Sequence, residues 1–377
     1  MKPLILHVGK GYWPNLGGME TITRQLAEGA VKEGFEVKVL AFGRGYYRET
    51  LNSVEIIRVP TLFNFGRAPI SHLFRRIFND LLENADIVHF HYPNPLAELV
   101  WLTMPPGIRK KKFCVCSYQS DPLKPKVLLP FYKILTRAFL GSCNRIAASS
   151  EQYRDSSPLL RGFKDKVRVI PLGVDTPDNL EVSEQDRTKM GNILSGRPSP
   201  RILFAGRFVY YKGLEYLLKA LQKVKGVSCI LVGNGPCMRE LEELADRLGI
   251  SERVLFPGHL EESLYRAVFE RSDLFVLPSV YRTEAFGLVA LEAMAAGMPL
   301  ITTEIGTATS VYNMDGVTGY VVPPFHVSML AERITDLAFN AEVRNRMGKN
   351  AYDHVRKNYS SEMMIEKYLD LYRYGKG

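Results

Sequence analysis

The stretch LFVLPSVYRTEAFGLVALEAMAAG, residues 274–297, contains one complete strand–loop–helix unit and decides the fold class. It begins with four consecutive apolar residues, a run typical of a strand that is buried on both faces of a sheet. A loop with a proline and several polar residues follows. The remainder is rich in Ala and Leu, which favour a helix, up to the helix-ending Gly297. Strand–helix units of this kind build parallel sheets covered by helices.

Short apolar runs alternate with amphipathic stretches along the whole chain. The runs before residue 175 that we expect to be strands are Leu4–Val8, Val37–Phe42, Ile87–Phe90, Phe113–Ser117, Arg145–Ala148 and Val167–Ile170. Those after residue 200 are Ile202–Ala205, Ser228–Val232, Val254–Phe256, Leu274–Leu277, Pro299–Thr302 and Gly319–Val322. A polar stretch with Gly, Pro and Ser separates the two sets, so the sequence predicts two doubly wound α/β domains.

The expected domain boundaries follow from these runs. We expect an N-terminal Rossmann-like domain at 1–175, a linker at 176–200, a C-terminal Rossmann-like domain at 201–357, and a helix at 358–377 that packs back on the first domain. Two domains of roughly 150–200 residues suit the length of 377 residues. Because ligands bind beyond the carboxyl ends of parallel strands, the chemistry is expected in the loops that follow the strands.

Composition narrows the class of function. No apolar run approaches the roughly 20 residues that span a bilayer. The five cysteines are an odd number without metal-ligand spacing, which favours a reducing cytoplasm over a disulfide framework. The formal net charge of +9 suggests a nucleic-acid partner. No helix-turn-helix, zinc-finger or RNA-binding motif accompanies it, so we expect no nucleic-acid partner.

The basic residues concentrate in the first half of the chain and leave two interpretations open. They include Arg75, Arg76, Arg109–Lys112, Lys124, Lys126, Lys133 and Arg137. Phe74 and Phe131 lie among them, and a basic surface with apolar residues can rest on an anionic membrane. Solvated charge at helix ends is the alternative interpretation.

Three strand-to-helix loops contain glycine, and one of them also contains cations. Gly17-Gly18 precedes a helix whose N-terminus and backbone N–H groups favour a phosphate, although ordinary turn chemistry explains the pair as well. Arg207 and Lys212 lie five residues apart in one loop of the second domain, and both can reach one diphosphate. Gly233 lies in a third loop, where a purely structural role is the alternative.

Residues 278–297 carry two carboxylates, Glu284 and Glu292, about two helical turns apart and near the same face. We expect Glu284 to accept hydrogen bonds from sugar hydroxyls and Glu292 to bind a ribose diol. The backbone of Phe286-Gly287-Leu288 would offer N–H groups to a phosphate. A helix cap or a surface acid explains either carboxylate alone, but it explains the whole string poorly.

The spacing of Glu284 and Glu292 resembles the Glu–seven residues–Glu motif of the retaining glycosyltransferases of family 4. These enzymes have the GT-B fold, two facing Rossmann-like domains with a cleft between them. The resemblance covers essentially the whole chain and includes Gly17-Gly18 and IPLGVD at 170–175. More specifically, YYKG at 210–213, RTEAFG at 282–287 and EIGTATS at 304–310 are similar to bacterial O-antigen mannosyltransferases and their D-rhamnosyl relatives. Those enzymes use GDP-sugars and extend lipid-linked polysaccharides.

The resemblance implies a role for each matching position. The catalytic residues would be Glu284, Arg207, Lys212 and Gln119. The donor would be bound by Gly17, Gly18, Arg207, Lys212, Gly233, His259, Glu284, Ala285, Phe286, Gly287, Leu288 and Glu292, and the acceptor by His91, Tyr92 and Asp121. The donor would be a GDP-sugar and the acceptor a polyprenyl-diphosphate-linked saccharide. The N-terminal domain at 1–175 would bind the acceptor, and the C-terminal domain at 201–357 would bind the nucleotide sugar. The enzyme would act in the cytoplasm or on the inner face of the cytoplasmic membrane.

One position departs from the family pattern. Where the family usually has a histidine near the 6-position of the donor sugar, this chain has Gln119, in the stretch SYQSD at 117–121. Gln119 can donate a hydrogen bond but cannot carry charge. We therefore hypothesise that Gln119 adapts the site to a 6-deoxy-mannose donor such as D-rhamnose.

The chain has no Asp-x-Asp pair for a metal that bridges a diphosphate, so we expect a metal-independent enzyme without a cofactor. Four alternatives stay open: a UDP-sugar-dependent glycosyltransferase, a nucleotide-sugar epimerase, a nucleotide-sugar-binding protein without turnover, and a nucleic-acid binder.

Overall fold

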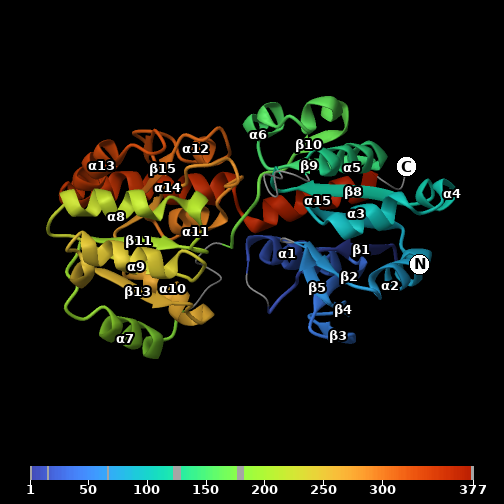
Figure 1. The fold of residues 1–377 in the computed structure, drawn as a ribbon, viewed down its shortest axis with the longest axis horizontal. Coiled ribbons are helices and arrows are strands. Elements are labelled where there is room, and N and C mark those ends of the chain that lie inside the picture. The colour runs from blue at the N-terminus through green and yellow to red at the C-terminus, as the bar shows by residue number, and fades with distance from the viewer. Residues whose placement is uncertain (1, 15–16, 66–67, 122–128, 176–181, 375–377) are drawn as a thin grey trace. The chain divides into compact units, whose positions relative to one another are not determined.

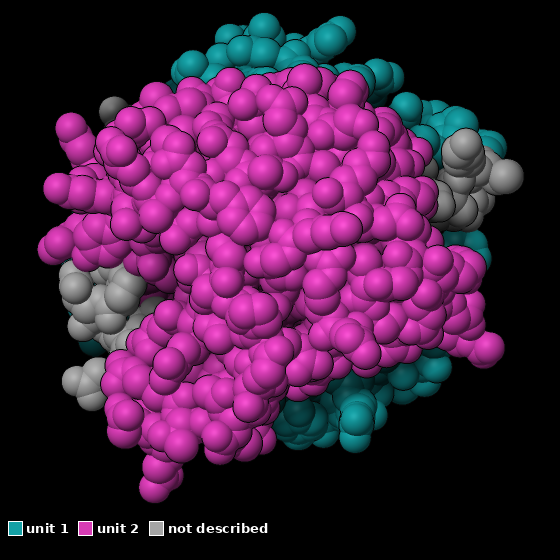
Figure 2. Space-filling view, turned by 90° about the vertical axis from the view of Figure 1, so that its left-hand side faces the viewer, with its two compact units in different colours: residues 1–172, 361–377 teal, residues 173–360 magenta. Residues whose placement is uncertain are grey.

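The structure is a computed structural model that describes residues 2–14, 17–65, 68–121, 129–175 and 182–374 (Figure 1). The chain divides into two compact units, which Figure 2 colours separately. Unit 1 comprises Met1–Leu172 and Ser361–Gly377, and unit 2 comprises Gly173–Ser360. The boundaries expected from the sequence, after 175 and after 357, lie three residues from these divisions.

Unit 1 is built on an eight-stranded sheet in the order β10-β9-β8-β7-β1-β2-β4-β3. The strands are β1 (Leu4–Val8), β2 (Glu36–Gly43), β3 (Tyr47–Leu51), β4 (Val54–Pro60), β7 (Ile87–Tyr92), β8 (Phe113–Tyr118), β9 (Arg145–Ala148) and β10 (Val167–Val169). Only β3 pairs in the antiparallel sense, at one edge. A separate antiparallel pair is formed by β5 (Phe63–Phe65) and β6 (Ala68–Ile70). The interior strands β1 and β7 are buried along their whole length, as a sheet covered on both faces requires, and they are apolar except for His7, His89, His91 and Tyr92.

The helices of unit 1 pack on this sheet. They are α1 (Gly18–Lys32), α2 (Phe74–Asn84), α3 (Pro95–Leu102), α4 (Pro106–Arg109), α5 (Leu129–Ser142), α6 (Glu151–Ser156), the 3-10 segment η1 (Leu160–Lys166) and the C-terminal α15 (Ser361–Tyr374). Helix α15 packs beside α1, where Gly29 leaves room for the side chain of Ile365. The first and last helices of the chain therefore share one hydrophobic contact.

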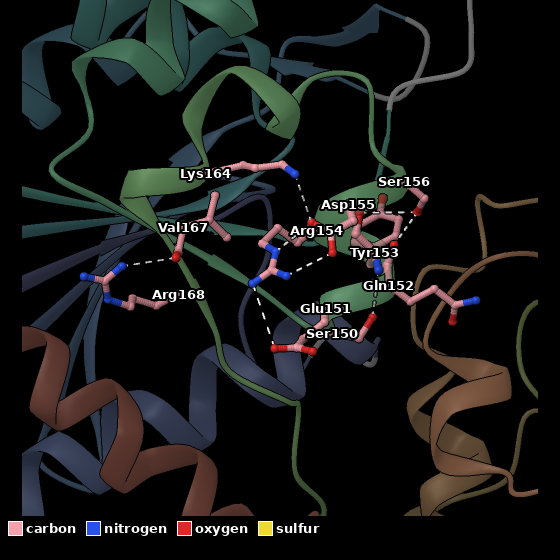
Figure 3. A network of polar contacts seen from close by, with 10 residues as sticks. All are labelled: Ser150, Glu151, Gln152, Tyr153, Arg154, Asp155, Ser156, Lys164, Val167 and Arg168. Carbon is pink, nitrogen blue, oxygen red and sulfur yellow. Dashed lines mark hydrogen bonds and ion pairs between the residues drawn. The ribbon is translucent and has the colours of Figure 1, made fainter.

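A network of polar contacts ties α6 to η1 (Figure 3). Ser150 caps α6 by accepting a hydrogen bond from the backbone N–H of Tyr153 at 3.0 Å. Asp155 accepts from Arg154 at 2.9 Å and forms an ion pair with Lys164 at 3.6 Å. These charges are largely exposed, so we assign them a modest contribution to stability.

Unit 2 contains a six-stranded parallel sheet in the order β13-β12-β11-β14-β15-β16. The strands are β11 (Arg201–Ala205), β12 (Ser228–Val232), β13 (Val254–Gly258), β14 (Leu274–Leu277), β15 (Leu300–Thr303) and β16 (Gly319–Val322). The helices are α7 (Glu184–Ile193), η3 (Tyr210–Lys212), α8 (Leu214–Lys223), α9 (Met238–Arg247), η4 (Ser251–Arg253), α10 (Glu262–Glu270), α11 (Leu288–Ala295), α12 (Thr309–Tyr312), α13 (Val327–Phe339) and α14 (Ala341–Asn358). Helices flank this sheet, with α8 packed against α9 and α13, and α11 packed against α14.

The range 176–200 is more than the linker expected from the sequence. It contains helix α7, which packs against α10. Arg187 joins the two helices through Glu270, with donor–acceptor distances of 2.9 and 3.2 Å. The polar composition of α7 hid it, because only Met190 is buried along its length.

In both sheets, strand order reverses at one point, which is where open α/β sheets bind ligands. The reversal lies between β1 and β7 in unit 1 and between β11 and β14 in unit 2. The loops after these four strands are therefore the first places to look for a functional site. No helix in the described part of the chain is long and apolar enough to cross a membrane.

Candidate active site

A buried ion pair lies at the reversal point of unit 2. Lys212, at the end of η3 after β11, pairs its Nζ with Oε2 of Glu284, in the loop after β14. Both residues are buried, with relative exposures of 8% and 7%. Ser279 donates a hydrogen bond from Oγ to the same carboxylate oxygen at 3.1 Å. Burying two charges costs several kcal/mol unless hydrogen bonds satisfy them, so an arrangement of this kind is a candidate functional site.

Close backbone contact between the two loops holds this pair. Gly213 has φ +67°, and a Cβ there would lie 2.1 Å from the carbonyl oxygen of Pro278. The backbone N–H of Val280 donates to the carbonyl of Tyr211 at 2.8 Å. Gly213 is thus required for the loop after β14 to approach the loop after β11. This approach brings Glu284 to Lys212.

Helix α11 begins at Leu288, four residues after Glu284, and Gly287 is its N-cap residue at φ +73°. Among the described residues, no side chain caps this helix. The hydroxyl of Tyr312 donates to the carbonyl of Phe286 at 2.8 Å and fixes the turn. Ala285 and Phe286 are buried, and Leu288 is half-buried. An uncapped helix N-terminus beside a lysine is a suitable place for a phosphate.

Glu292 lies on the same helix as a half-buried carboxylate. Its Oε2 accepts a hydrogen bond from the Tyr265 hydroxyl at 2.7 Å. Burial raises the pKa of Glu292, while the Tyr265 hydrogen bond opposes that rise. Tyr265 comes from α10, and nothing in the local sequence signals this partnership.

The remaining predicted donor residues of unit 2 lie at the same edge of the sheet. Arg207 and His259 are exposed in the loops after β11 and β13. Gly233 has φ +127°, and a Cβ there would lie 2.0 Å from the carbonyl oxygen of Gly206. Its N–H donates to the carbonyl of Gly258 at 2.8 Å. Gly233 therefore allows close backbone contact among the loops that follow β11, β12 and β13.

The Gly17-Gly18 turn of unit 1 starts helix α1, as the sequence indicated. The carboxylate of Glu20 lies where side chains at Gly11 and Gly17 would be, so only glycine suits those positions while Glu20 lies there. Burial raises the pKa of Glu20. A diphosphate at Gly17 would meet this carboxylate, so diphosphate binding there requires Glu20 to move or to be protonated.

Gln119 and Asp121 follow strand β8 in unit 1. The side-chain Oε1 and Nε2 of Gln119 are buried, and among the described residues neither has a hydrogen-bond partner. Asp121 accepts from the hydroxyls of Tyr118 at 2.8 Å and Ser157 at 2.7 Å, which fixes its carboxylate. Gln119 is thus the polar side chain here that has unused hydrogen-bonding capacity.

The other predicted acceptor residues, His91 and Tyr92, are 1% exposed. His91 Nε2 lies 3.0 Å from His7 Nδ1, and the Tyr92 ring stacks on Tyr118. Direct contact with an acceptor gains no support at either residue, because both side chains are used in packing. The sequence did not distinguish these two residues from surface residues, because a polar residue near the end of a strand can be either buried or exposed.

His91 belongs to a buried cluster of three imidazoles with His7 and His89, whose ligand-type nitrogens lie within 4.8 Å of one another. His89 contacts the hydroxyls of Tyr372 at 2.6 Å and Ser117 at 2.7 Å, so the cluster connects the sheet to α15. Burial lowers the pKa of all three histidines, that of His91 to about 3. They are neutral at physiological pH, and we interpret the cluster as a hydrogen-bonded part of the core.

Glu98 is a buried carboxylate that sequence reasoning missed. Its Oε1 accepts from the backbone N–H of Asn94 at 2.8 Å and from the Tyr132 hydroxyl at 2.7 Å. Burial raises the pKa of Glu98 to about 7. No motif marks this residue in the sequence, because its burial depends on the packing of α3 against α5.

Two family models match the chain, one over each half. Residues 16–177 match "Glycosyltransferase Family 4", and residues 186–354 match "Glycosyl transferases group 1". Over nearly the whole length, the chain is 33% identical to the O-antigen chain mannosyltransferase C of Escherichia coli, covering 98% of this chain and 97% of that protein. The chain belongs to glycosyltransferase family 4. It is a hexosyltransferase, and the resemblance noted in its sequence is confirmed.

A second full-length relative is the D-rhamnosyltransferase WbpZ of Pseudomonas aeruginosa, 33% identical over 95% of this chain and 92% of that protein. Among solved structures, the sucrose-phosphate synthase of Thermosynechococcus elongatus superposes with a TM-score of 0.80 at 22% identity, covering 99% of this chain and 98% of that chain. Anabaena HepE, solved with UDP and glucose, gives a TM-score of 0.78 at 18% identity, covering 98% and 99%. These structures establish the GT-B fold of two Rossmann-like domains.

Proposed function

We propose that this family 4 enzyme transfers mannose or D-rhamnose from a GDP-sugar to a lipid-linked saccharide, with retention of configuration and without a metal. The saccharide would be an O-antigen precursor on a polyprenyl diphosphate. The observation that carries this proposal is the full-length likeness to two enzymes named for mannosyl and D-rhamnosyl transfer. The buried Lys212–Glu284 pair supports it, because it lies where a nucleotide sugar would bind in this fold.

In the proposed mechanism, the bond between the anomeric carbon and the diphosphate oxygen breaks as the acceptor hydroxyl attacks from the same face. The acceptor proton passes to the departing phosphate oxygen. Lys212, Arg207 and the N–H groups at the start of α11 offset the negative charge that grows on the diphosphate. Preorganised donors of this kind contribute about 2.7–4 kcal/mol each where they have been measured. Glu284 orients the sugar through its hydroxyls, and Glu292 holds the ribose.

We further propose that the enzyme works at the inner face of the cytoplasmic membrane. Helix α5 exposes Phe131 and Ile134, with relative exposures of 72% and 66%. The cations Lys133 and Arg137 lie on the same helix and are also exposed. Exposed apolar side chains next to cations favour an anionic lipid surface, where a lipid-linked acceptor would be found.

A donor panel tests the reaction. The purified enzyme is assayed by thermal shift and by turnover with GDP-mannose, GDP-D-rhamnose and UDP-glucose, with and without EDTA. We expect a GDP-sugar to raise the melting temperature and to be consumed only when a saccharide acceptor is present, with or without EDTA. Consumption without acceptor would indicate an epimerase, and preference for UDP-glucose would overturn the donor assignment.

A further inference from the structure

Four aromatic side chains of unit 2 form a continuous row near the Lys212–Glu284 pair. The row, called the aromatic platform, consists of Tyr216, Phe325, Tyr281 and Tyr210. Successive ring centroids are 5.3, 5.8 and 5.8 Å apart. Tyr210, Tyr281 and Phe325 are 44%, 46% and 47% exposed, so the row presents its rings to solvent. An exposed aromatic patch of this kind marks a binding surface.

The platform is assembled at the edge of the sheet where the proposed reaction takes place. Tyr210 follows β11, Tyr281 follows β14 and Phe325 follows β16. Tyr210 is two residues from Lys212, and Tyr281 is three residues from Glu284. The backbone contact of Gly213 with Pro278 that positions the ion pair therefore also brings Tyr210 to Tyr281.

Phe325 adopts a conformation that bulky residues rarely have, with φ +66°. Pro323 and Pro324 precede it, and the His326 side chain caps α13 by accepting from the N–H of Met329 at 3.2 Å. The residues on either side thus hold the backbone in place. Glycine would adopt this φ without strain, so the presence of phenylalanine indicates that the ring itself serves a purpose.

The lysine that lies over the platform is paired with a carboxylate. Lys219 lies 5.2 Å from the Tyr216 ring centroid, and its Nζ forms an ion pair with Glu215 at 3.1 Å. Exposed aromatic rings whose overlying lysine is already paired favour a neutral amphiphilic partner over an anionic lipid surface. A pyranose ring has this chemistry, with C–H groups on its face for the aromatic ring and hydroxyls at its rim for the tyrosine O–H groups.

We propose that the aromatic platform binds the saccharide part of the acceptor, at sugar residues next to the one that receives the new hexose. This inference rests on the proposed function, because it assigns the platform to the acceptor of that reaction. It names Tyr210, Tyr281 and Phe325 as residues that set acceptor affinity, while the Lys212–Glu284 pair acts on the donor.

Steady-state kinetics on three variants tests the proposal. Phe325→Gly removes a ring and relieves the backbone, and Tyr281→Ala removes the neighbouring ring. Phe339→Ala is the matched control, because Phe339 is 57% exposed at the other end of α13, about 20 Å along the helix. We expect each platform variant to raise the acceptor KM about two- to tenfold, as the loss of one aromatic contact predicts. The donor KM and kcat stay within about twofold, and the control matches the wild type. Unchanged acceptor KM in both platform variants would overturn the proposal.

A direct binding measurement separates this proposal from the proposed function. Saturation-transfer NMR with α-mannotriose, in the absence of any nucleotide sugar, should show contact with sugar C–H protons in the wild type and in Phe339→Ala. The signal should be clearly weaker in Phe325→Gly and Tyr281→Ala. If the enzyme turns over no GDP-sugar but the variants change the NMR signal as expected, the proposed reaction is wrong and saccharide binding by the platform is supported. If turnover is normal but the signal is equal in all variants, the platform assignment fails alone.

Vesicle co-sedimentation tests whether the aromatic platform binds a lipid surface instead of a saccharide. Vesicles of phosphatidylethanolamine and phosphatidylglycerol should bind the platform variants as well as the wild type. Loss of vesicle binding in Phe325→Gly, with trisaccharide binding retained, would overturn the saccharide assignment in favour of lipid.

Discussion

The two units share one architecture but bury different kinds of polar group at the carboxyl edge of their sheets. Unit 2 buries a full ion pair, Lys212 with Glu284. Unit 1 buries three imidazoles of lowered pKa and Glu98 with its pKa raised to about 7, and its buried cation, Arg58, pairs with a carboxylate, Glu49, that is exposed. A parallel sheet thus sets where polar side chains gather but not their charge. Unit 2 buries both partners of its ion pair, and Lys212 of that pair is a cation of the kind that binds a diphosphate.

The largest effect is expected where the buried charge of unit 2 is broken. Lys212→Met leaves Glu284 buried without its partner, which costs about 3–5 kcal/mol in the free energy of unfolding. Replacing both residues, in Lys212→Met/Glu284→Met, removes the unpaired charge, so stability should return close to that of the wild type. Chemical denaturation measures both values.

Activity should behave differently from stability in the same variants. We expect kcat/KM to fall about a hundred- to a thousandfold or more in each single variant and to remain low in the double variant, because charge stabilisation of the leaving diphosphate is lost. Recovery of activity together with stability in the double variant would mean that the pair is only structural.

A second prediction concerns the loop contact that creates the pair. Gly213→Ala places a Cβ against the carbonyl oxygen of Pro278 at φ +67°. We expect it to lower the free energy of unfolding by about 3 kcal/mol, the upper end for a strained backbone position. Gly297→Ala is the control, since Gly297 has φ +77° and nothing within 4 Å of its Cβ position. Equal losses in the two variants would show that conformation, not loop contact, decides the cost.

A third prediction tests the protonated state of Glu98 in unit 1 through the pH dependence of stability. The folded-state pKa of Glu98, about 7, lies above the ordinary glutamate pKa of 4.5. Between these values the folded state holds the extra proton, so the stability that Glu98 contributes is present below pH 4.5 and is lost as pH rises through 7. Relative to the wild type, Glu98→Gln should therefore gain up to about 1.4 kcal/mol per pH unit across this window.

The prediction compares the stability of Glu98→Gln with that of the wild type, because the three imidazoles change stability with pH in the opposite direction. Their pKa values are lowered on folding, so the stability they contribute is lost as pH falls below 6.5. Glu252→Gln, at an exposed position of unit 2, is the control. A flat difference between Glu98→Gln and the wild type from pH 5 to 7 would contradict the buried, protonated state of Glu98.

The smallest effect is expected at Gln119, which takes the place of the family histidine in the proposed enzyme. If Gln119 selects a 6-deoxy sugar, Gln119→His should shift the ratio of kcat/KM for GDP-mannose over GDP-D-rhamnose by about tenfold towards GDP-mannose. Both donors are measured on the wild type and on the variant. An efficient wild-type reaction with GDP-mannose and none with GDP-D-rhamnose would rule out this role.

Much of the fold was predictable from the sequence, because strands buried on both faces leave continuous apolar runs. The predicted runs at Leu4–Val8, Arg145–Ala148 and Leu274–Leu277 coincide with β1, β9 and β14. Strands β3 and β4 were missed for physical reasons. Strand β3 is an exposed edge strand of mostly polar residues, and β4 contains Arg58, which is buried through bonds to Glu49 and to the backbone of Trp13.

The sequence by itself determined the family and the loops that carry glycine, cations and carboxylates, since these depend on residue type and spacing along the chain. Only the tertiary structure decided that Lys212 and Glu284 pair, that Tyr265 holds Glu292, that His91 and Tyr92 are buried, and that four distant aromatic residues form one row. These contacts depend on which loops lie next to each other at the edge of a sheet. Strand order determines which loops are neighbours, and the packing of the whole domain determines strand order. The spacing of residues along the sequence therefore does not reveal these contacts.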